Sequence, residues 1–264
     1  MPLLPPDTDA NVLVVGATRG IGLEFARQLL QADAVTHLFA TYREEITATE
    51  LFSLQSQHPS RLHLLQMDIT DEETIRHSLD TVQQTIQRTA TTRKPELHLA
   101  INCVGLLHNK QQQPEKALRQ LEADKLINYF RVNSVGPALL AKHLMPLFKH
   151  KTPALFATIS AKVGSIGDNR LGGWYGYRAS KAALNMLLKT AAIEYSRRTP
   201  NTTVVMLHPG TTDTDLSKPF QRGVPEGKLF STERTVSQLL QVLDNVSPED
   251  SGEFFSWDGS RLPW

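Results

Sequence analysis

The chain has 264 residues, of which 40% are apolar and 21% are charged, a composition that excludes a long disordered chain. It holds 28 Lys and Arg residues against 27 Asp and Glu residues, and this balance argues against binding to nucleic acid or membranes through bulk charge. A single cysteine, Cys103, excludes an internal disulfide and a cysteine-based metal cluster.

The first ten residues predict a flexible tail. The opening stretch MPLLPPDTDAN contains no Lys or Arg, and its prolines interrupt the apolar run. A secretory signal combines a basic start with an apolar stretch of about 7–15 residues. A membrane span needs roughly 18 apolar residues, which no window of the chain approaches. We therefore expect a cytoplasmic protein with one domain over residues 11–264.

Short apolar runs alternate with helical patterns along the rest of the chain. The runs that predict strands are 11–15, 37–41, 61–66, 97–104, 154–160, 203–207 and 253–257. Helical patterns cover 20–31, 48–57, 71–88, 126–150, 175–198 and 231–246, with Thr70 as the N-cap of the third. This alternation implies parallel strands joined by helices. The predicted fold class is α/β, a doubly wound parallel sheet of about seven strands with helices on both faces.

A glycine-rich turn, Gly16-Ala-Thr-Arg-Gly20-Ile-Gly22, joins the first predicted strand to the first predicted helix. Glycines there let the backbone turn sharply and approach a pyrophosphate, and the helix start offers free N–H groups. The glycine spacing differs from G-x-G-x-x-G. The turn therefore indicates a dinucleotide site, with a plain strand–helix turn as the alternative.

The end of the second predicted strand bears on the choice of dinucleotide. NAD sites commonly place an acid there to hold the ribose 2′-hydroxyl, but this strand ends without an acid before Arg43. Arg19, in the glycine-rich turn, could approach the same place, and two guanidinium groups suit a 2′-phosphate. The pattern favours NADP over NAD. Alternatively, both are surface arginines, and Glu44 or Glu45 neutralises Arg43.

Tyr177 and Lys181 are four residues apart, so on a helix they share a face. A phenol ordinarily has a pKa near 10, too high for ready proton exchange at neutral pH. A nearby ammonium and a cationic nicotinamide ring would both lower that pKa, which predicts an acid/base pair at a carbonyl carbon. The alternative is an ordinary amphipathic helix.

Together these motifs resemble the short-chain dehydrogenase/reductase family, from about residue 11 to the C-terminus. More narrowly, the stretch from Val163 to Asn185 and the C-terminal Trp257-Asp-Gly resemble the branch that contains C-factor and sniffer carbonyl reductase. Asn102-Cys-Val-Gly105 stands where the family has Asn-Asn-Ala-Gly, and Asp68 stands where an acid commonly faces the adenine. Asn133 matches the family's active-site asparagine, and Pro209-Gly210 matches the turn that holds the nicotinamide. The resemblance implies a single Rossmann-like domain.

The resemblance also implies roles for individual residues. Tyr177 would be the catalytic acid/base, Lys181 would hold the nicotinamide ribose, and Asn133 would keep a water in the proton path. The cofactor contacts that it implies are Gly16, Thr18, Arg19, Gly20, Ile21, Gly22, Arg43, Asp68, Ile69, Asn102, Val104, Gly105, Tyr177, Lys181, Pro209, Gly210, Thr212 and Thr214. We expect an NADP(H)-dependent oxidoreductase of the carbonyl reductase type, acting on a small carbonyl or alcohol. We expect no metal, because the histidines lack ligand spacing. A homodimer or homotetramer through helices 126–150 and 175–198 is expected by analogy with relatives.

One departure concerns the family's active-site serine, the second residue of a Ser-Ser pair. Here the pair reads Ser160-Ala161, so the expected hydroxyl falls on Ala161. Either Ser160 or Ser165 supplies the hydroxyl, or Tyr177 polarises the substrate alone. Ser160 is named as the fourth catalytic candidate, although strand alternation counts against it. Ala161 also supports a rival hypothesis, a dinucleotide-binding regulator with little turnover.

Two loops carry further alternatives. Trp174, after Gly172-Gly173, either lines a substrate cleft or serves ordinary packing. The stretch 219–228 contains two prolines and two glycines, and it is either a mobile lid or an ordinary loop.

Overall fold

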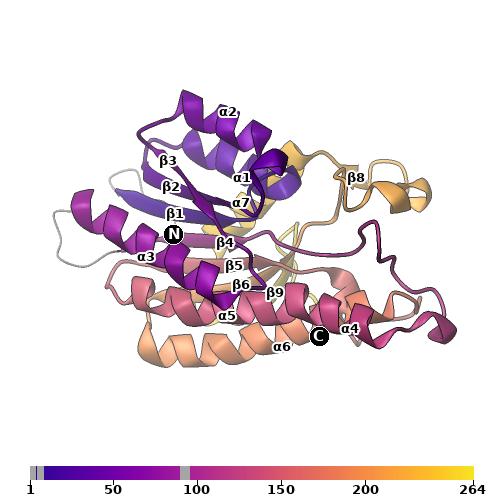
Figure 1. Ribbon diagram of the computed structural model, residues 1–264. Coiled ribbons are helices and arrows are strands. Elements are labelled where there is room, and N and C mark those ends of the chain that lie inside the picture. The colour runs from indigo at the N-terminus through magenta and orange to yellow at the C-terminus, as the bar shows by residue number, and fades with distance from the viewer. Residues whose placement is uncertain (1–3, 5–8, 90–95) are drawn as a thin grey trace.

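Seven parallel strands form the central sheet, in the order β3-β2-β1-β4-β5-β6-β9 (Figure 1). The computed structural model describes residue 4 and residues 9–89 and 96–264. The strands are β1 Ala10–Val15, β2 Val35–Tyr42, β3 Leu62–Gln66, β4 Leu99–Asn102, β5 Ala154–Ile159, β6 Thr202–His208 and β9 Phe254–Ser256. The order reverses between β1 and β4. The carboxyl ends of these two strands therefore flank the crevice where such sheets bind ligands.

Helices cover both faces of the sheet, which confirms the predicted doubly wound fold (Figure 1). They are α1 Gly20–Leu30, α2 Thr49–Gln57, α3 Glu72–Thr89, α4 Ala123–Phe130, α5 Gly136–Leu144, α6 Tyr175–Arg198 and α7 Thr232–Asn245. Val12 and Val14 of β1 pack in the core under α1, α2 and α7, whereas Leu13 and Val15 pack under α3, α5 and α6. Since successive side chains of a strand alternate, β1 is buried along its whole length.

The N-terminal boundary differs from the prediction by one residue. β1 begins at Ala10, whose side chain is buried and whose N–H donates to the carbonyl of Ala34 at 2.8 Å. The expected tail over the first ten residues falls mostly on residues 1–3 and 5–8, which lie outside the described residues. β4 is also shorter than the predicted run 97–104.

The predicted long helical region over 126–150 is confirmed as an unbroken run from Ala123 to Phe148, but it is not a uniform α-helix. α4 ends at Phe130, a π-helical turn covers Arg131–Val135, α5 follows, and a 3₁₀ turn covers Met145–Phe148. A Cβ at Gly136 would lie 2.6 Å from the carbonyl oxygen of Ile69, so a glycine is needed where α5 passes that loop. Single π turns inside α-helices often occur at functional sites.

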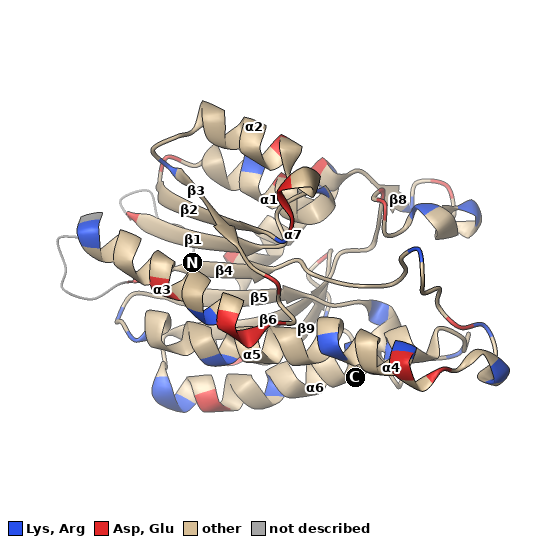
Figure 2. Ribbon diagram, in the orientation of Figure 1, with Lys and Arg blue, Asp and Glu red and all other residues tan. Residues whose placement is uncertain are grey.

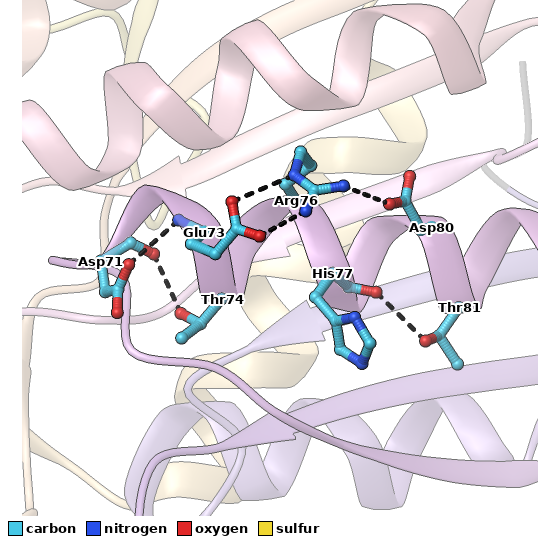
Figure 3. Close-up of polar contacts among 7 residues, drawn as sticks. All are labelled: Asp71, Glu73, Thr74, Arg76, His77, Asp80 and Thr81. Atoms are coloured by element: carbon cyan, nitrogen blue, oxygen red, sulfur yellow. Dashed lines mark hydrogen bonds and ion pairs between the residues drawn. The ribbon is translucent and has the colours of Figure 1, made fainter.

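The cap of α3 also corrects the prediction, as the close-up in Figure 3 shows. Asp71, and not Thr70, accepts from the N–H of Glu73 at 3.0 Å. The Thr70 hydroxyl instead donates to Asp68 at 2.7 Å. Along the same helix, Arg76 is paired with Glu73 and Asp80. A local bond to the preceding acid thus removes Thr70 from the capping role that its position suggested.

Charged residues of both signs are distributed over the helices and loops, as the colouring of Figure 2 shows, while the strands of the sheet are largely uncharged. Within the described ranges, no helix is both long enough and apolar enough to span a bilayer.

Acid sensitivity follows from a buried histidine, His98, next to β4. Its Nδ1 accepts from the N–H of Asn11 at 3.1 Å, and burial lowers its pKa to about 4. In the unfolded chain the pKa is near 6.5, so the unfolded state binds a proton first as the pH falls. Stability should therefore decrease between about pH 6.5 and 4, with a loss of about 2 kcal/mol between pH 7 and 5.

Urea unfolding at these two pH values tests this expectation. His98→Asn keeps an acceptor for Asn11 and should reduce the pH dependence, whereas His77→Asn, at an exposed position of α3, should leave it unchanged. Equal pH dependence in the wild type and in His98→Asn would contradict the assignment.

Candidate active site

The turn between β1 and α1 has the geometry of a phosphate cradle. Gly16 and Gly20 adopt positive φ angles of 82° and 54°, and a Cβ at Gly22 would lie 2.1 Å from the carbonyl oxygen of Gly16. The first turn of α1 has no side-chain cap. Its N–H groups can therefore be offered to an anion. The predicted contacts Thr18 and Ile21 lie half-buried in this turn.

Thr214 comes to the same turn from a distant part of the chain. A Cβ at Gly20 would lie 3.1 Å from the Thr214 Cγ2 atom. Thr214, a predicted cofactor contact, is therefore a neighbour of the glycine-rich turn in the structure.

Both predicted phosphate-binding arginines are exposed and ion-paired. Arg19 lies 3.4 Å from Asp215, and Arg43 lies 3.1 Å from Glu44, the neighbour that the sequence suggested could neutralise it. Exposed pairs of this kind contribute little to stability, with a median of about 0–1 kcal/mol. These ion pairs are therefore only a weak obstacle to phosphate binding by Arg19 or Arg43.

Asp68 and Ile69 follow β3 at the same end of the sheet. Asp68 Oδ1 accepts from the N–H and the hydroxyl of Thr70, at 2.8 and 2.7 Å. Ile69 is buried, and its carbonyl oxygen faces Gly136 at the start of α5. The two residues thus form a braced loop beside the crevice.

The segment after β4 connects the glycine-rich turn to α6. A Cβ at Gly16 would lie 2.8 Å from the Val104 Cγ2 atom, and a Cβ at Gly105 would lie 3.5 Å from the Lys181 Nζ atom. Asn102 is fully buried; its Oδ1 accepts from the N–H of Val104 at 3.1 Å. The Asn102 Nδ2 atom has no hydrogen-bond partner among the residues that the structure describes. A buried donor of this kind is suited to a bound polar group.

Cys103, between them, is packed against the core, and burial raises the pKa of its thiol. It serves as a small apolar side chain.

Tyr177 and Lys181 lie side by side in the first turns of α6, and both are buried. The Lys181 Nζ atom is 5.9 Å from the centre of the Tyr177 ring and donates to the carbonyl oxygen of Ile159 at 3.0 Å. The Tyr177 hydroxyl has no hydrogen bond to any described residue. The α6 helix runs over the predicted bounds, so the pair shares a face as expected.

Burial sets the electrostatics of the pair in the protein alone. With a smaller contribution from Tyr129, it raises the pKa of Tyr177, and a pKa lowered by a bound nicotinamide ring stays a prediction. Burial also lowers the pKa of Lys181, to about 8. Removing either group from water disfavours its charged form, and in the protein alone this effect exceeds the attraction between ammonium and phenolate.

Asn133 lies fully buried in the π turn between α4 and α5. Its Oδ1 accepts from the N–H of Leu106 at 2.7 Å, and its Nδ2 donates to the Leu106 carbonyl at 2.9 Å and to the Ser180 hydroxyl at 3.0 Å. Both amide hydrogens are therefore used, and only a second lone pair on Oδ1 could hold a water. The side chain joins the β4 loop to α6.

The alternation of side chains after β5 separates Ala161 from Ser160, the first two positions considered for the active-site hydroxyl. Ala161 has an extended backbone and packs in the cluster that contains Tyr177. The preceding residue, Ser160, is buried, and its hydroxyl donates to Asn185 Oδ1 at 2.6 Å. The Ser165 hydroxyl accepts from the N–H of Asp168 at 3.1 Å. This geometry counts against Ser160 as a catalytic residue, because neighbouring extended residues face opposite sides.

The segment after β6 provides the remaining predicted contacts. Pro209 is followed by Gly210, which has a φ of 72°, and a Cβ there would lie 2.6 Å from the Phe230 ring. Thr212 is buried, and its hydroxyl is 2.9 Å from that of Thr235 in α7. Two strands of two residues each, β7 Thr211–Thr212 and β8 Leu229–Phe230, pair in parallel and close this loop. Neither of these two short strands was predicted from the sequence.

Aromatic residues gather around Tyr177. The Trp174 ring centre lies 6.2 Å from that of Tyr177 and 4.9 Å from that of Phe220, which belongs to the 219–228 stretch. Tyr129 packs on the Tyr177 ring at 6.4 Å, and His108 packs on Phe220 at 5.6 Å. Trp174 therefore lies beside Tyr177, and whether it lines a substrate cleft stays a prediction. The other three aromatic neighbours had no local signal in the sequence.

Among the described ranges, no group of His, Cys, Asp or Glu side chains is arranged to hold a metal ion.

Comparison with known proteins identifies the class. A family model described as short chain dehydrogenase matches residues 10–224, and the chain belongs to that family. Members of this family are NAD(P)-dependent oxidoreductases, and this is the class that the fold and the site define. The resemblance predicted from the motifs is thus confirmed.

Particular relatives are similar over most of the chain. The NADPH-bound carbonyl reductase from chicken fatty liver is 30% identical, with a TM-score of 0.84 over 97% of this chain and 100% of that one. Carbonyl reductase Sniffer of D. melanogaster is 24% identical, with a TM-score of 0.83 over the same shares. C-signal of Myxococcus xanthus is 32% identical over 148 residues, which are 56% of this chain and 84% of that protein.

The tightness of the glycine-rich turn gives a stability prediction. Gly22→Ala places a methyl group 2.1 Å from a backbone oxygen that cannot move freely, and should destabilise the protein by about 3 kcal/mol. Gly223→Ala is the matched control, because a Cβ there has no atom within 4 Å. Thermal unfolding of both variants measures the difference. A Gly22→Ala variant as stable as the control would mean that the turn is looser than described.

Proposed function

We propose that the protein is an NADP(H)-dependent carbonyl reductase that interconverts a small carbonyl compound and its alcohol. The observation that carries the proposal is the buried Tyr177–Lys181 pair, which lies beside Gly105 at the carboxyl ends of β1 and β4, where the strand order reverses. The nearby aromatic cluster provides apolar walls for a substrate. Family membership supports the oxidoreductase class, and the proposal adds the cofactor, substrate class and residue roles.

The choice of NADP is supported by two arginines and by a relative. Arg19 and Arg43 border the glycine-rich turn, and no acid stands at the end of β2. The chicken carbonyl reductase, 30% identical, binds NADPH. The residues present fit such a cofactor: three glycines keep side chains out of the turn, and the Asn102 Nδ2 atom is a donor without a described partner.

The cofactor would be held along the carboxyl ends of the strands. The β1–α1 turn would bind the pyrophosphate, the Asn102–Gly105 and Asp68–Ile69 loops would border the adenosine half, and Pro209–Thr214 would contact the nicotinamide half. When bound, the nicotinamide supplies or accepts the hydride.

Proton transfer is the task of Tyr177. Because burial raises its pKa, the phenol is protonated at neutral pH and can donate its proton to a carbonyl oxygen. Lys181, with a pKa of about 8, keeps a positive charge beside the phenol at neutral pH and would hold the nicotinamide ribose. Ala161 offers no second hydroxyl, so the Tyr177 hydroxyl alone polarises the substrate.

The second candidate, a dinucleotide-binding regulator with little turnover, is supported by Ala161. Loss of one hydrogen-bond donor at a developing oxyanion can lower a rate by about 10²–10³. If the protein is a carbonyl reductase, Ala161 in place of the serine predicts slow turnover. If it is a regulator, no measurable turnover is expected.

Substitution of the phenol separates the two candidates. Tyr177→Phe should abolish NADPH oxidation over a panel of aldehydes and ketones and leave NADPH affinity within about threefold, because only the proton donor is removed. Tyr175→Phe, two residues earlier on α6, is the control and should remain active. If wild type and Tyr177→Phe both bind NADPH and both fail to oxidise it, the regulator becomes the better description.

Cofactor preference is tested at Arg43. Arg43→Ala should weaken NADPH binding ten- to hundredfold and change NADH binding little, since a hydrogen bond to a charged group contributes about 1.5–3 kcal/mol. Arg76→Ala removes another exposed, ion-paired arginine, on α3, and serves as the control. Titration calorimetry with both cofactors measures the effect. Equal affinity of the unmutated protein for NADPH and NADH would overturn the preference.

A further inference from the structure

A buried carboxylate, Glu115, meets the start of α6 from the loop between β4 and α4. Its side chain is only 3% exposed. The Glu115 Oε2 atom accepts from the N–H of Gly176 at 3.1 Å, and the Glu115 carbonyl oxygen accepts from the N–H of Trp174 at 2.5 Å. One residue, 61 positions earlier in the chain, thus binds two backbone donors at the start of this helix.

The start of α6 is not capped by its own residues. Trp174, its N-cap residue, makes no side-chain capping bond, and the first turn contains no acidic residue. Trp174 also has a φ of 52°, in the left-handed region that is unfavourable for a bulky side chain. Such a conformation persists only where the surroundings fix it. A carboxylate from another segment supplies the missing acceptor and suits the positive end of the helix dipole.

Contacts on either side leave this junction little freedom. A Cβ at Gly176 would lie 2.4 Å from the Tyr129 Cδ2 atom and 3.0 Å from the Glu115 Oε1 atom. The loop that carries Glu115 is in turn tied to α4, because the buried Gln112 side chain donates to the Lys125 carbonyl at 3.1 Å and accepts from Asn128 at 2.9 Å. The position of Glu115 is therefore fixed by the scaffold.

We propose that Glu115 is a positioning residue of the active site, which fixes the start of α6 and thereby places the Tyr177 hydroxyl and the Trp174 ring. Gly176 lies between Trp174 and Tyr177 in the chain, and the rings of Trp174 and Tyr177 are in contact. A displacement of this turn would move the proton donor and one wall of the aromatic cluster together. This inference rests on the proposed oxidoreductase function, and it extends that function to a residue outside the reacting groups.

Three substitutions at Glu115 test the proposal. Glu115→Ala removes the acceptor of the Gly176 N–H. Glu115→Asp keeps the carboxylate, but its side chain is one methylene too short for this hydrogen bond. Glu115→Gln keeps an acceptor oxygen on a side chain of the same length. We expect kcat to fall at least tenfold and KM to rise in the Ala and Asp variants, because a shift of about 1 Å at a reacting group can cost 10²-fold. Glu115→Gln should stay within about threefold. Glu122→Ala, at an exposed ion pair in the same region, is the control.

Hydrogen exchange provides a readout that does not require a substrate. The amides of residues 174–181 should exchange at least tenfold faster in the Ala and Asp variants than in the wild type, whereas Gln and the Glu122→Ala control should retain protection. If Glu115→Ala does not fold, the comparison of Asp with Gln decides. Wild-type kcat, KM and exchange in Glu115→Asp, or a Gln variant as impaired as Asp, would overturn the inference. A wild-type protein that reduces no carbonyl compound would refute the proposed function. Hydrogen exchange of residues 174–181 would still test whether Glu115 fixes the start of α6.

Discussion

The hydrogen bond from the Lys181 ammonium to the Ile159 carbonyl joins α6 to the carboxyl end of β5, and the active site depends on this contact. Burying an ammonium is unfavourable unless it has a partner, and here a backbone carbonyl provides one. A Cβ at Gly164 would lie 2.8 Å from the Lys181 Cβ atom, so the helix is packed closely against the loop after β5. The central sheet thus determines where the lysine, and the tyrosine one turn before it, can lie.

The same burial adjusts the chemistry of both groups in one direction. It raises the pKa of Tyr177 and lowers that of Lys181, so burial shifts both equilibria toward the neutral form. In the proposed mechanism, the neutral phenol near the apolar cluster donates its proton to a developing alkoxide. Since Ala161 adds no hydroxyl, this proposal assigns the polarisation of the carbonyl to Tyr177 alone.

The predictions from sequence succeeded where local patterns reflect burial. The strand–helix alternation predicted the sheet, and α6 has the predicted bounds because Pro200 and the glycines before Trp174 mark its ends. Contacts between distant segments left no local signal, so Glu115 and Phe220 were missed.

Two further features have physical reasons for being missed. The i, i+4 spacing of Tyr177 and Lys181 showed that they share a face but could not show how deeply they are buried, so the sequence did not reveal the burial that raises the phenol pKa in the protein alone. Likewise, no helical pattern reveals the π turn within the helical region over 126–150, or the close approach of Gly136 to Ile69 directly after it.

The most direct test is a crystal structure of the protein with NADP⁺. We predict that the nicotinamide ring lies next to Tyr177 in the crevice at the carboxyl ends of β1 and β4. The Lys181 Nζ atom should lie at hydrogen-bond distance, about 2.6–3.2 Å, from a ribose hydroxyl. A nucleotide bound elsewhere, or a nicotinamide ring separated from the Tyr177 hydroxyl by protein, would contradict it.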